Sequence, residues 1–346
     1  MNRRLLLAAS ALAASVACKQ PAAPAPAPAS ADRPSDNKPQ AAAVATPPGR
    51  SDERCVAPLD TPTSSFSLRP KRGKLVLGVF SGLKDATTEN LVHLRALIDE
   101  VKKRGAEILI ADGDLGDSPE EQELLLGALV QSGLPVLATA SNREVRTDLD
   151  AAELALQKRG AVLFDLSHTR VVDLGDVLAV GLPGAYDRRQ LHAEGGCVYV
   201  QRDLDALDRW IAKLPPSAPP VLLIAAVPPK GQDARALDAS DGQNLGDARL
   251  LPLLQTRRAA FGVFGQVWEA GGRAIDGTGK PIPQGQAAEQ LYLNPGAAEL
   301  TPWPMADGTT STGQAAVLTI EGRRAAFEVV RRPPPPKAAA TGDRAG

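Results

Sequence analysis

The sequence predicts a layered α/β domain with buried sheets, and three features of its hydrophobic pattern lead to this prediction. Short apolar runs alternate with amphipathic segments between about residues 73 and 331. The first segments follow a β-α-β-α-β order, which is typical of parallel strands joined by helices. The last apolar runs follow one another with no helical pattern between them, which indicates further β structure. Near-continuous apolar strands of this kind are covered on both faces.

The first half of this region alternates strands with helices. Apolar runs predict strands at Lys74–Phe80, Glu107–Ala111 and Leu134–Thr139. Apolar residues at helical spacing predict a helix over Asn90–Arg104. A second helix should begin at Ser118-Pro119, because serine is a favoured N-cap and proline fits the first helical turn.

The second half of this region is richer in β structure. Its short apolar runs predict strands at Ala161–Leu166, Val171–Asp173, Val177–Val180, Val221–Ala226, Ala260–Phe264, Leu291–Leu293, Ala315–Ile320 and Ala325–Val329. These strands complete the sheets of the predicted domain.

Composition narrows the classes of function. Of 346 residues, 43% are hydrophobic, which is enough to fill a sizeable core. The formal net charge is -1, so no overall positive field attracts nucleic acid, and we expect no nucleic-acid partner. The chain has only three histidines, His93, His168 and His192, although histidine is the commonest metal ligand and acid–base group. We expect His93 to be packed or on the surface, since it lies in a helical pattern.

The N-terminus carries an export signal. Two arginines precede an apolar stretch over residues 5–14, and the small residues Ser15-Val16-Ala17 stand before Cys18. This layout is typical of a secretory signal peptide and is too short to span a bilayer. The cysteine after small residues resembles the lipobox of bacterial lipoproteins. That resemblance implies cleavage before Cys18, a palmitate-type lipid anchor on Cys18 and, because Lys19 follows, the outer membrane. The alternative is a plain signal peptide without lipid.

The chain divides into four regions by composition. Residues 1–18 form the signal peptide, and residues 19–72 form a Pro/Ala-rich tether and lead-in segment that cannot bury a core. Residues 73–331 form the folded domain, and residues 332–346 form a disordered tail. With Cys18 lipidated, Cys55 and Cys197 remain; in an oxidising envelope they either form a disulfide or stay as two thiols.

Six short segments follow predicted strands in one order. They are Ser81-Gly82-Leu83-Lys84-Asp85, Gly113-Asp114-Leu115-Gly116-Asp117, Ser141-Asn142-Arg143-Glu144, Ala225-Ala226-Val227-Pro228-Pro229, Gly265-Gln266-Val267-Trp268 and Asn294-Pro295-Gly296. Their order and spacing resemble the blocks of calcineurin-like metallophosphoesterases. This resemblance implies a four-layer αββα sandwich in which strand-end loops hold two metal ions that activate water against a phosphoester.

Most metal-ligand positions implied by this resemblance are changed. At the first metal, Gly82, Lys84 and Trp268 accompany the retained Asp114, and we expect no ion there. The second metal would retain Asp114 and Asn142, with Ala226 and Gln266 in place of histidines. Asp114, Asn142 and Gln266 could hold a hard cation only weakly. Arg143 stands where the family has a histidine that aids the transition state, and we identify no catalytic residue.

Two cations and a tryptophan of this region have alternative interpretations. In one interpretation, Lys84 and Arg143 form an anion site for a phosphate or carboxylate. In the other, which we expect, Lys84 forms a salt bridge with Asp114. Trp268 either stacks on a ligand ring or fills the space of a lost ligand, which we also expect.

The sequence therefore predicts a membrane-anchored envelope lipoprotein whose folded domain lies outside the cytoplasm. Its degenerate metallophosphoesterase-like domain would be a non-catalytic binding or scaffold module without cofactor. The expected partner is an envelope protein or a small anion. The alternative is an active phosphoesterase with an altered site for Mn, Fe, Zn or Mg.

Overall fold

The computed structural model describes residues 55–59, 65–68, 72–255 and 259–332. The predicted signal peptide, Cys18, most of the predicted tether and nearly all of the predicted tail lie outside these residues. Within the described part of the chain, no helix is both long and apolar enough to cross a membrane.

One sheet has six strands in the order β18-β17-β2-β3-β4-β5. Its members are β2 (Lys74–Phe80), β3 (Ile108–Asp112), β4 (Val136–Thr139), β5 (Leu163–Asp165), β17 (Gln314–Glu321) and β18 (Arg324–Arg331). Strands β2 to β5 run parallel, and β17 pairs antiparallel with both β2 and β18. The carboxyl ends of β2, β3 and β4 therefore meet at one edge of the sheet.

The second sheet has eight strands in the order β1-β6-β7-β8-β11-β14-β12-β13. Its members are β1 (Ser65–Ser67), β6 (Val171–Asp173), β7 (Leu178–Gly181), β8 (Val221–Ile224), β11 (Phe261–Val263), β12 (Arg273–Ile275), β13 (Pro281–Ile282) and β14 (Leu291–Asn294). Two small pairs lie outside both sheets: β9 (Ala239–Ser240) with β10 (Gln243–Asn244), and β15 (Trp303–Pro304) with β16 (Thr310–Ser311).

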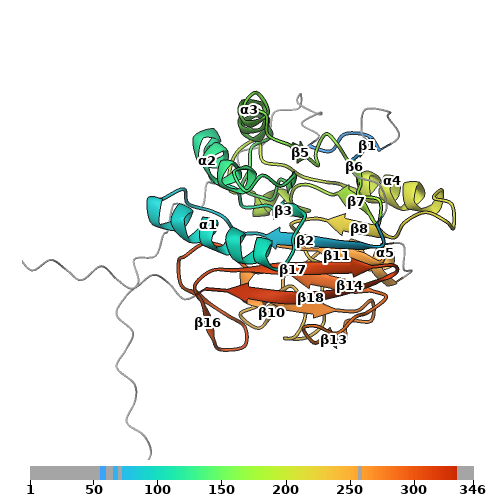
Figure 1. The fold of residues 1–346 in the computed structure, drawn as a ribbon. Coiled ribbons are helices and arrows are strands. Elements are labelled where there is room, and N and C mark those ends of the chain that lie inside the picture. The colour runs from blue at the N-terminus through green and yellow to red at the C-terminus, as the bar shows by residue number, and fades with distance from the viewer. Residues whose placement is uncertain (1–54, 60–64, 69–71, 256–258, 333–346) are drawn as a thin grey trace, which may run out of the picture. The chain divides into compact units, whose positions relative to one another are not determined.

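The helices are α1 (Thr88–Lys103), α2 (Pro119–Val130), α3 (Arg146–Gln157), α4 (Gln201–Ala212) and α5 (Leu251–Gln255), with short 3-10 turns η2 (Arg188–Gln190), η3 (Ala248–Leu250) and η4 (Trp268–Ala270). Ser118 caps α2 as predicted: its side chain accepts a hydrogen bond from the Glu121 N–H, and proline follows in the first turn. Figure 1 shows α1, α2 and α3 grouped together, with α4 apart from them.

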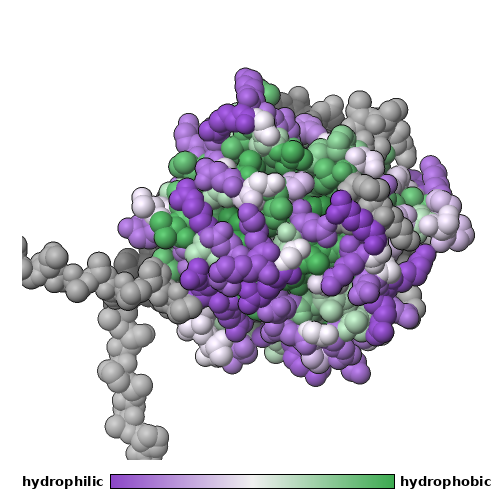
Figure 2. Space-filling model, viewed as in Figure 1, coloured by the Kyte–Doolittle hydropathy of each residue, from purple (hydrophilic) through white to green (hydrophobic). Residues whose placement is uncertain are grey.

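Alternation along the strands produces the layers. In β2, Leu75, Leu77 and Val79 belong to a core cluster that also contains residues of the second sheet, so they lie between the sheets. The intervening Val76 and Phe80 belong to the cluster that contains the buried residues of α1 and α2. The order is helices, sheet, sheet and helices, and the predicted αββα sandwich is confirmed. Figure 2 shows that hydrophilic residues cover most of one face of the molecule.

The folded unit extends N-terminal of the predicted boundary at residue 73. Cys55 forms a disulfide with Cys197, with 5.2 Å between their Cα atoms, which decides between the two states that the sequence left open. Val56 and Leu59 are buried in the helix-side core. Strand β1 then adds to the edge of the second sheet, parallel to β6.

Candidate functional site

A cavity of about 590 Å³ lies where the strand-end loops of the two sheets meet. Many of its lining residues follow β2, β3 and β4 in one sheet and β8 and β11 in the other. Of the residues singled out from the sequence, those that line it are Lys84, Asp114, Asn142, Arg143, Gln266 and Trp268.

The two remaining predicted positions lie directly beside this lining. A Cβ placed on Gly82 would lie 2.9 Å from Trp268 Nε1, and the Ala226 carbonyl accepts a hydrogen bond from the Gln266 N–H at 2.9 Å. The structure thus brings together all the positions that the sequence analysis placed in the cleft.

The loop between β7 and α4 supplies cavity residues that the sequence analysis did not identify. Arg189, Gln190, Leu191 and His192 line one side of the cavity. The loop is fastened to the strand-end block: Asn142 Nδ2 donates to the Gln190 carbonyl at 2.8 Å, and the His192 N–H donates to the Asn142 carbonyl at 3.0 Å. His192 was visible as one of three histidines, but no spacing linked it to the strand-end blocks.

Both carboxylate oxygens of Asp114 accept hydrogen bonds from neighbouring side chains. Ser141 Oγ lies 2.7 Å from Oδ1, and Trp268 Nε1 donates to Oδ2 at 3.1 Å. The backbone of Asp114 is left-handed, with φ of 56°, directly after Gly113 with φ of 73°. This tight turn at the end of β3 aims the carboxylate into the cleft.

A second buried acid, Glu144, shares Ser141 with Asp114. Its carboxylate accepts the backbone N–H groups of Leu115 and Ser141, each at 2.5 Å, and Ser141 Oγ lies 2.9 Å from Oε2. One hydroxyl proton can serve only one of the two carboxylates, so the other contact requires a protonated acid. Burial, followed by the nearby Asp114 charge, raises the pKa of Glu144 to about 7, and burial also raises the pKa of Asp114.

Lys84 does not pair with Asp114, and that prediction is wrong. Its Nζ lies 3.4 Å from Glu299 Oε1, and it sits over two indole rings, 4.7 Å from the centroid of Trp268 and 5.2 Å from that of Trp303. Asp114 Oδ2 instead accepts a hydrogen bond from Trp268 Nε1, and the ammonium group of Lys84 has the Glu299 carboxylate as its partner. Glu299 and Trp303 belong to a segment without a recognisable motif.

Arg143 pairs with Asp117, the second aspartate of the segment that follows β3. Its guanidinium forms a forked ion pair with Asp117, with contacts of 2.6 and 3.0 Å. Trp268 is 8% exposed and packs edge-on against Trp303 with 4.9 Å between ring centroids. In this structure Trp268 fills space within the cleft, as we expected.

The residues present do not fit a two-metal centre. Gly82 offers no donor, and a longer side chain there would collide with Trp268 and with Ala297, whose Cβ is also 2.9 Å from the added Cβ. Lys84 brings a positive charge to a position where a cation would bind. The oxygens of Asp114 face an indole N–H and a hydroxyl. Gln266 Oε1, by contrast, is buried and makes no hydrogen bond.

The chain has two face-to-face sheets that are covered by helices, and its strand-end loops carry polar side chains around a cavity. This arrangement is the fold of calcineurin-like phosphoesterases. No family model matches the chain, and no curated protein matches its sequence.

Solved structures do match this fold. One is 12% identical to the chain with a TM-score of 0.55, and the match covers 75% of this chain and 99% of the other. A dimetal phosphatase from Danio rerio is 12% identical over 74% of this chain and 98% of its own, with a TM-score of 0.48. A purple acid phosphatase from yellow lupin is 11% identical over 76% of this chain and 52% of its own, with a TM-score of 0.47. At these identities the likeness concerns the fold.

Proposed function

We propose that this protein is a non-catalytic binding module of the bacterial cell envelope. In this proposal, lipid on Cys18 holds it to a membrane, and we favour the outer membrane. The observation that carries the proposal is the state of Asp114. Its two oxygens accept hydrogen bonds from Ser141 and Trp268, and Trp268 also fills the space beside Gly82. Without two metal ions to clamp a phosphoester and lower the pKa of water, hydrolysis lacks a nucleophile.

The cavity has the chemistry of a binding site for an anionic group. Lys84, Arg143 and Arg189 line it together with the apolar surface of Trp268 and Trp303. Arginine forks recognise carboxylates and phosphates in two-point geometry, and indole rings bind flat apolar groups. Glu299, Asp117 and Asp187 already pair with Lys84, Arg143 and Arg189, respectively. We therefore favour a small anion, or an acidic side chain of an envelope protein, that exchanges with these internal carboxylates.

The test of this proposal is an assay of the full chain with p-nitrophenyl phosphate and its diester in the presence of Mn²⁺. We expect no turnover above the buffer rate. Turnover by the wild type that Asp114→Ala abolishes would show a working hydrolase and overturn the proposal. Calorimetry with inorganic phosphate, repeated on Lys84→Ala, then measures whether the cavity holds an anion.

A second candidate function is an active phosphoesterase that uses one metal ion. The observation in its favour is the unpaired Oε1 of Gln266, which lines the cavity together with Asp114 and Asn142. These three side chains could supply oxygen donors to Mg²⁺ or Mn²⁺. Elemental analysis of protein purified without chelator distinguishes the two candidate functions. One bound ion per chain that is lost in Gln266→Ala supports the enzyme. If the protein is a binding module, Gln266→Ala should not change the metal content.

The lipid anchor has a separate test. We expect the mature protein from bacterial cells to incorporate radiolabelled palmitate and to partition into detergent. Cys18→Ala should abolish both properties. Release of the wild-type protein into the soluble envelope fraction without label would support the plain signal peptide instead.

A further inference from the structure

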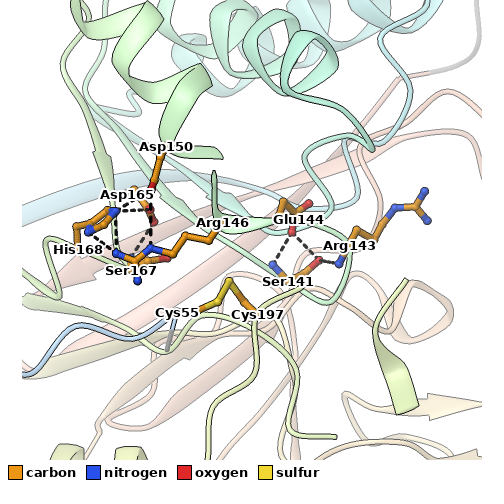
Figure 3. The surroundings of a disulfide bond; sticks show 10 residues. All are labelled: Cys55, Ser141, Arg143, Glu144, Arg146, Asp150, Asp165, Ser167, His168 and Cys197. Carbon is orange, nitrogen blue, oxygen red and sulfur yellow. Dashed lines mark hydrogen bonds and ion pairs between the residues drawn. A yellow bond between two sulfur atoms is a disulfide. The ribbon is translucent and has the colours of Figure 1, made fainter. Parts of the chain in front are cut away.

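A second group of ionisable side chains lies outside the cavity, at the junction of α3 with the turn after β5 (Figure 3). Asp150 comes from α3, Asp165 ends β5, and His168 follows in the turn. One ligand atom from each of these residues lies within 4.8 Å of the other two. None of the three residues lines the cavity described above.

An unpartnered buried oxygen points into this group. Asp165 is only 1% exposed, and its Oδ1 accepts the Ser167 N–H at 2.8 Å. Its Oδ2 is buried and makes no hydrogen bond, with His168 Nε2 3.9 Å away. A buried carboxylate oxygen without a partner is costly, so the fold is expected to supply one.

We propose that Asp150, Asp165 and His168 form a zinc site that fastens α3 to the turn after β5. His168 Nε2 lies 2.7 Å from Asp150 Oδ1 and 3.9 Å from Asp165 Oδ2. Donors on a tetrahedral zinc ion are about 3.3 Å apart, given bonds of about 2.0–2.1 Å. The two measured separations lie on either side of this value, so small side-chain rotations are enough to close the site.

The donor types select zinc over the hard divalent cations. An imidazole nitrogen suits Zn²⁺, whereas Mg²⁺ and Ca²⁺ prefer oxygen ligands alone. The side chains of His168 and Asp150 are 42% and 40% exposed, which leaves an open side where water completes the coordination. Asp165, from the buried side, anchors the ion to the sheet.

Arg146 is the resident cation of the group and competes with the metal. Its Nη2 lies 2.9 and 3.2 Å from the two ring nitrogens of His168, and its Nε lies 3.8 Å from Asp150 Oδ2. The side chain is 31% exposed at the first residue of α3, so it can swing into solvent as zinc enters. Its charge opposes the ion, and removal of that charge should strengthen zinc binding.

Calorimetry with ZnCl₂ tests this site on the untagged full chain after removal of metal with a chelator. We expect one zinc ion per chain, with affinity reduced at least tenfold in His168→Ala and in Asp165→Asn. Arg146→Ala should bind zinc more tightly than the wild type. Asp148→Asn, on the same helix, is the matched control and should bind as the wild type does.

Two further measurements separate this site from the cavity and from misfolding. Gln266→Ala, which alters the cavity lining, should leave zinc binding unchanged, whereas loss of binding in that variant would place the ion in the cavity and overturn the proposal. Thermal unfolding without zinc should show His168→Ala folded, and zinc should raise the melting temperature of the wild type but not of this variant. Absence of zinc binding by the wild type, or undiminished binding by His168→Ala, would also overturn it.

Discussion

The cavity and the α3–β5 group, which consists of Asp150, Asp165 and His168, both contain a buried acid. The two acids differ in whether both carboxylate oxygens already accept hydrogen bonds. In the cavity, Asp114 accepts hydrogen bonds at both oxygens, from Ser141 and Trp268. In the α3–β5 group, Asp165 keeps one oxygen without a hydrogen bond. Each carboxylate oxygen offers about two lone-pair sites, and every hydrogen bond that it accepts leaves fewer of them for a metal ion. We therefore expect Asp114, the retained aspartate of the strand-end block, to be the weaker metal ligand of the two.

The disulfide connects the surroundings of both regions. The Ala57 N–H, two residues after Cys55, donates to the Ser167 carbonyl beside His168. On the other side, the Cys197 carbonyl accepts the Ala185 N–H, and the preceding Gly184 N–H donates to the Ala140 carbonyl beside Ser141. Figure 3 draws this disulfide with Asp150, Asp165 and His168 on one side and Ser141, Arg143 and Glu144 on the other. The first test therefore removes the Cys55–Cys197 disulfide, which lies between the two regions.

Loss of the disulfide should have the largest effect on stability. Cys55 and Cys197 are separated by 142 positions, and closure of a loop of that length stabilises the native state by about 5 kcal/mol in the chain-entropy account. We expect Cys55→Ser with Cys197→Ser to lower the unfolding free energy by about 3–5 kcal/mol in urea titrations. Reductant should lower the stability of the wild type and leave that of the double variant unchanged. Equal stability of the two proteins would show that the disulfide adds nothing to the stability of the fold.

Replacement of Asp114 should have the next largest effect. Asp114→Ala leaves the indole N–H of Trp268 without its acceptor in a buried site, at a cost of about 1–3 kcal/mol in unfolding free energy, whereas the Ser141 hydroxyl keeps Glu144 as an acceptor. Asp117→Ala is the matched control and should cost less than about 1 kcal/mol, because Asp117 is exposed. A metal-binding aspartate held ready for an ion would instead tolerate alanine in metal-free buffer, and that outcome would break the contrast between the two regions.

The pH dependence of stability should show a smaller effect, to which Glu144 beside the cavity contributes. Burial raises the pKa of Glu144 from 4.5 to about 7, so the folded state holds a proton that the unfolded state has released. Stability from this group is full below pH about 4.5 and is lost as the pH rises through about 7. We expect the unfolding free energy to fall by on the order of 2 kcal/mol between about pH 5 and 8.

Glu144→Gln should make this pH profile shallower, and Glu120→Gln, at an exposed position of α2, should not change it. Glu153, whose pKa burial also raises to about 7, contributes in the same direction near the α3–β5 group. A profile that rises with pH, or one that Glu144→Gln leaves intact, would contradict the shared proton in the cavity.

The sequence was sufficient to predict the central strands, because buried parallel strands appear as continuous apolar runs, as in Lys74–Phe80. It did not reveal β1, whose three residues contain a single apolar side chain and pair with a strand more than a hundred positions away. The helices α3 and α4 were also not assigned, although Leu149, Ala152 and Leu156 follow helical spacing in α3.

For the cavity, the sequence predicted which residues lie there but not which side chains they contact. Strand-end position identified which residues meet there, because the carboxyl ends of neighbouring parallel strands share one edge. The sequence did not reveal their partners: Lys84 contacts Glu299 and Trp303, which follow β14 in a segment without motif, and Asp114 contacts Trp268. Side-chain direction depends on the tertiary packing around each turn, and spacing along the chain does not encode it.

A crystal grown with Mn²⁺ and measured at the manganese absorption edge tests the central claim most directly. We expect no anomalous peak beside Asp114, with the indole N–H of Trp268 still in contact with the Asp114 carboxylate. Two well-occupied ions bridged by Asp114, with Trp268 displaced, would contradict the account and show that the cleft retains a working metal centre.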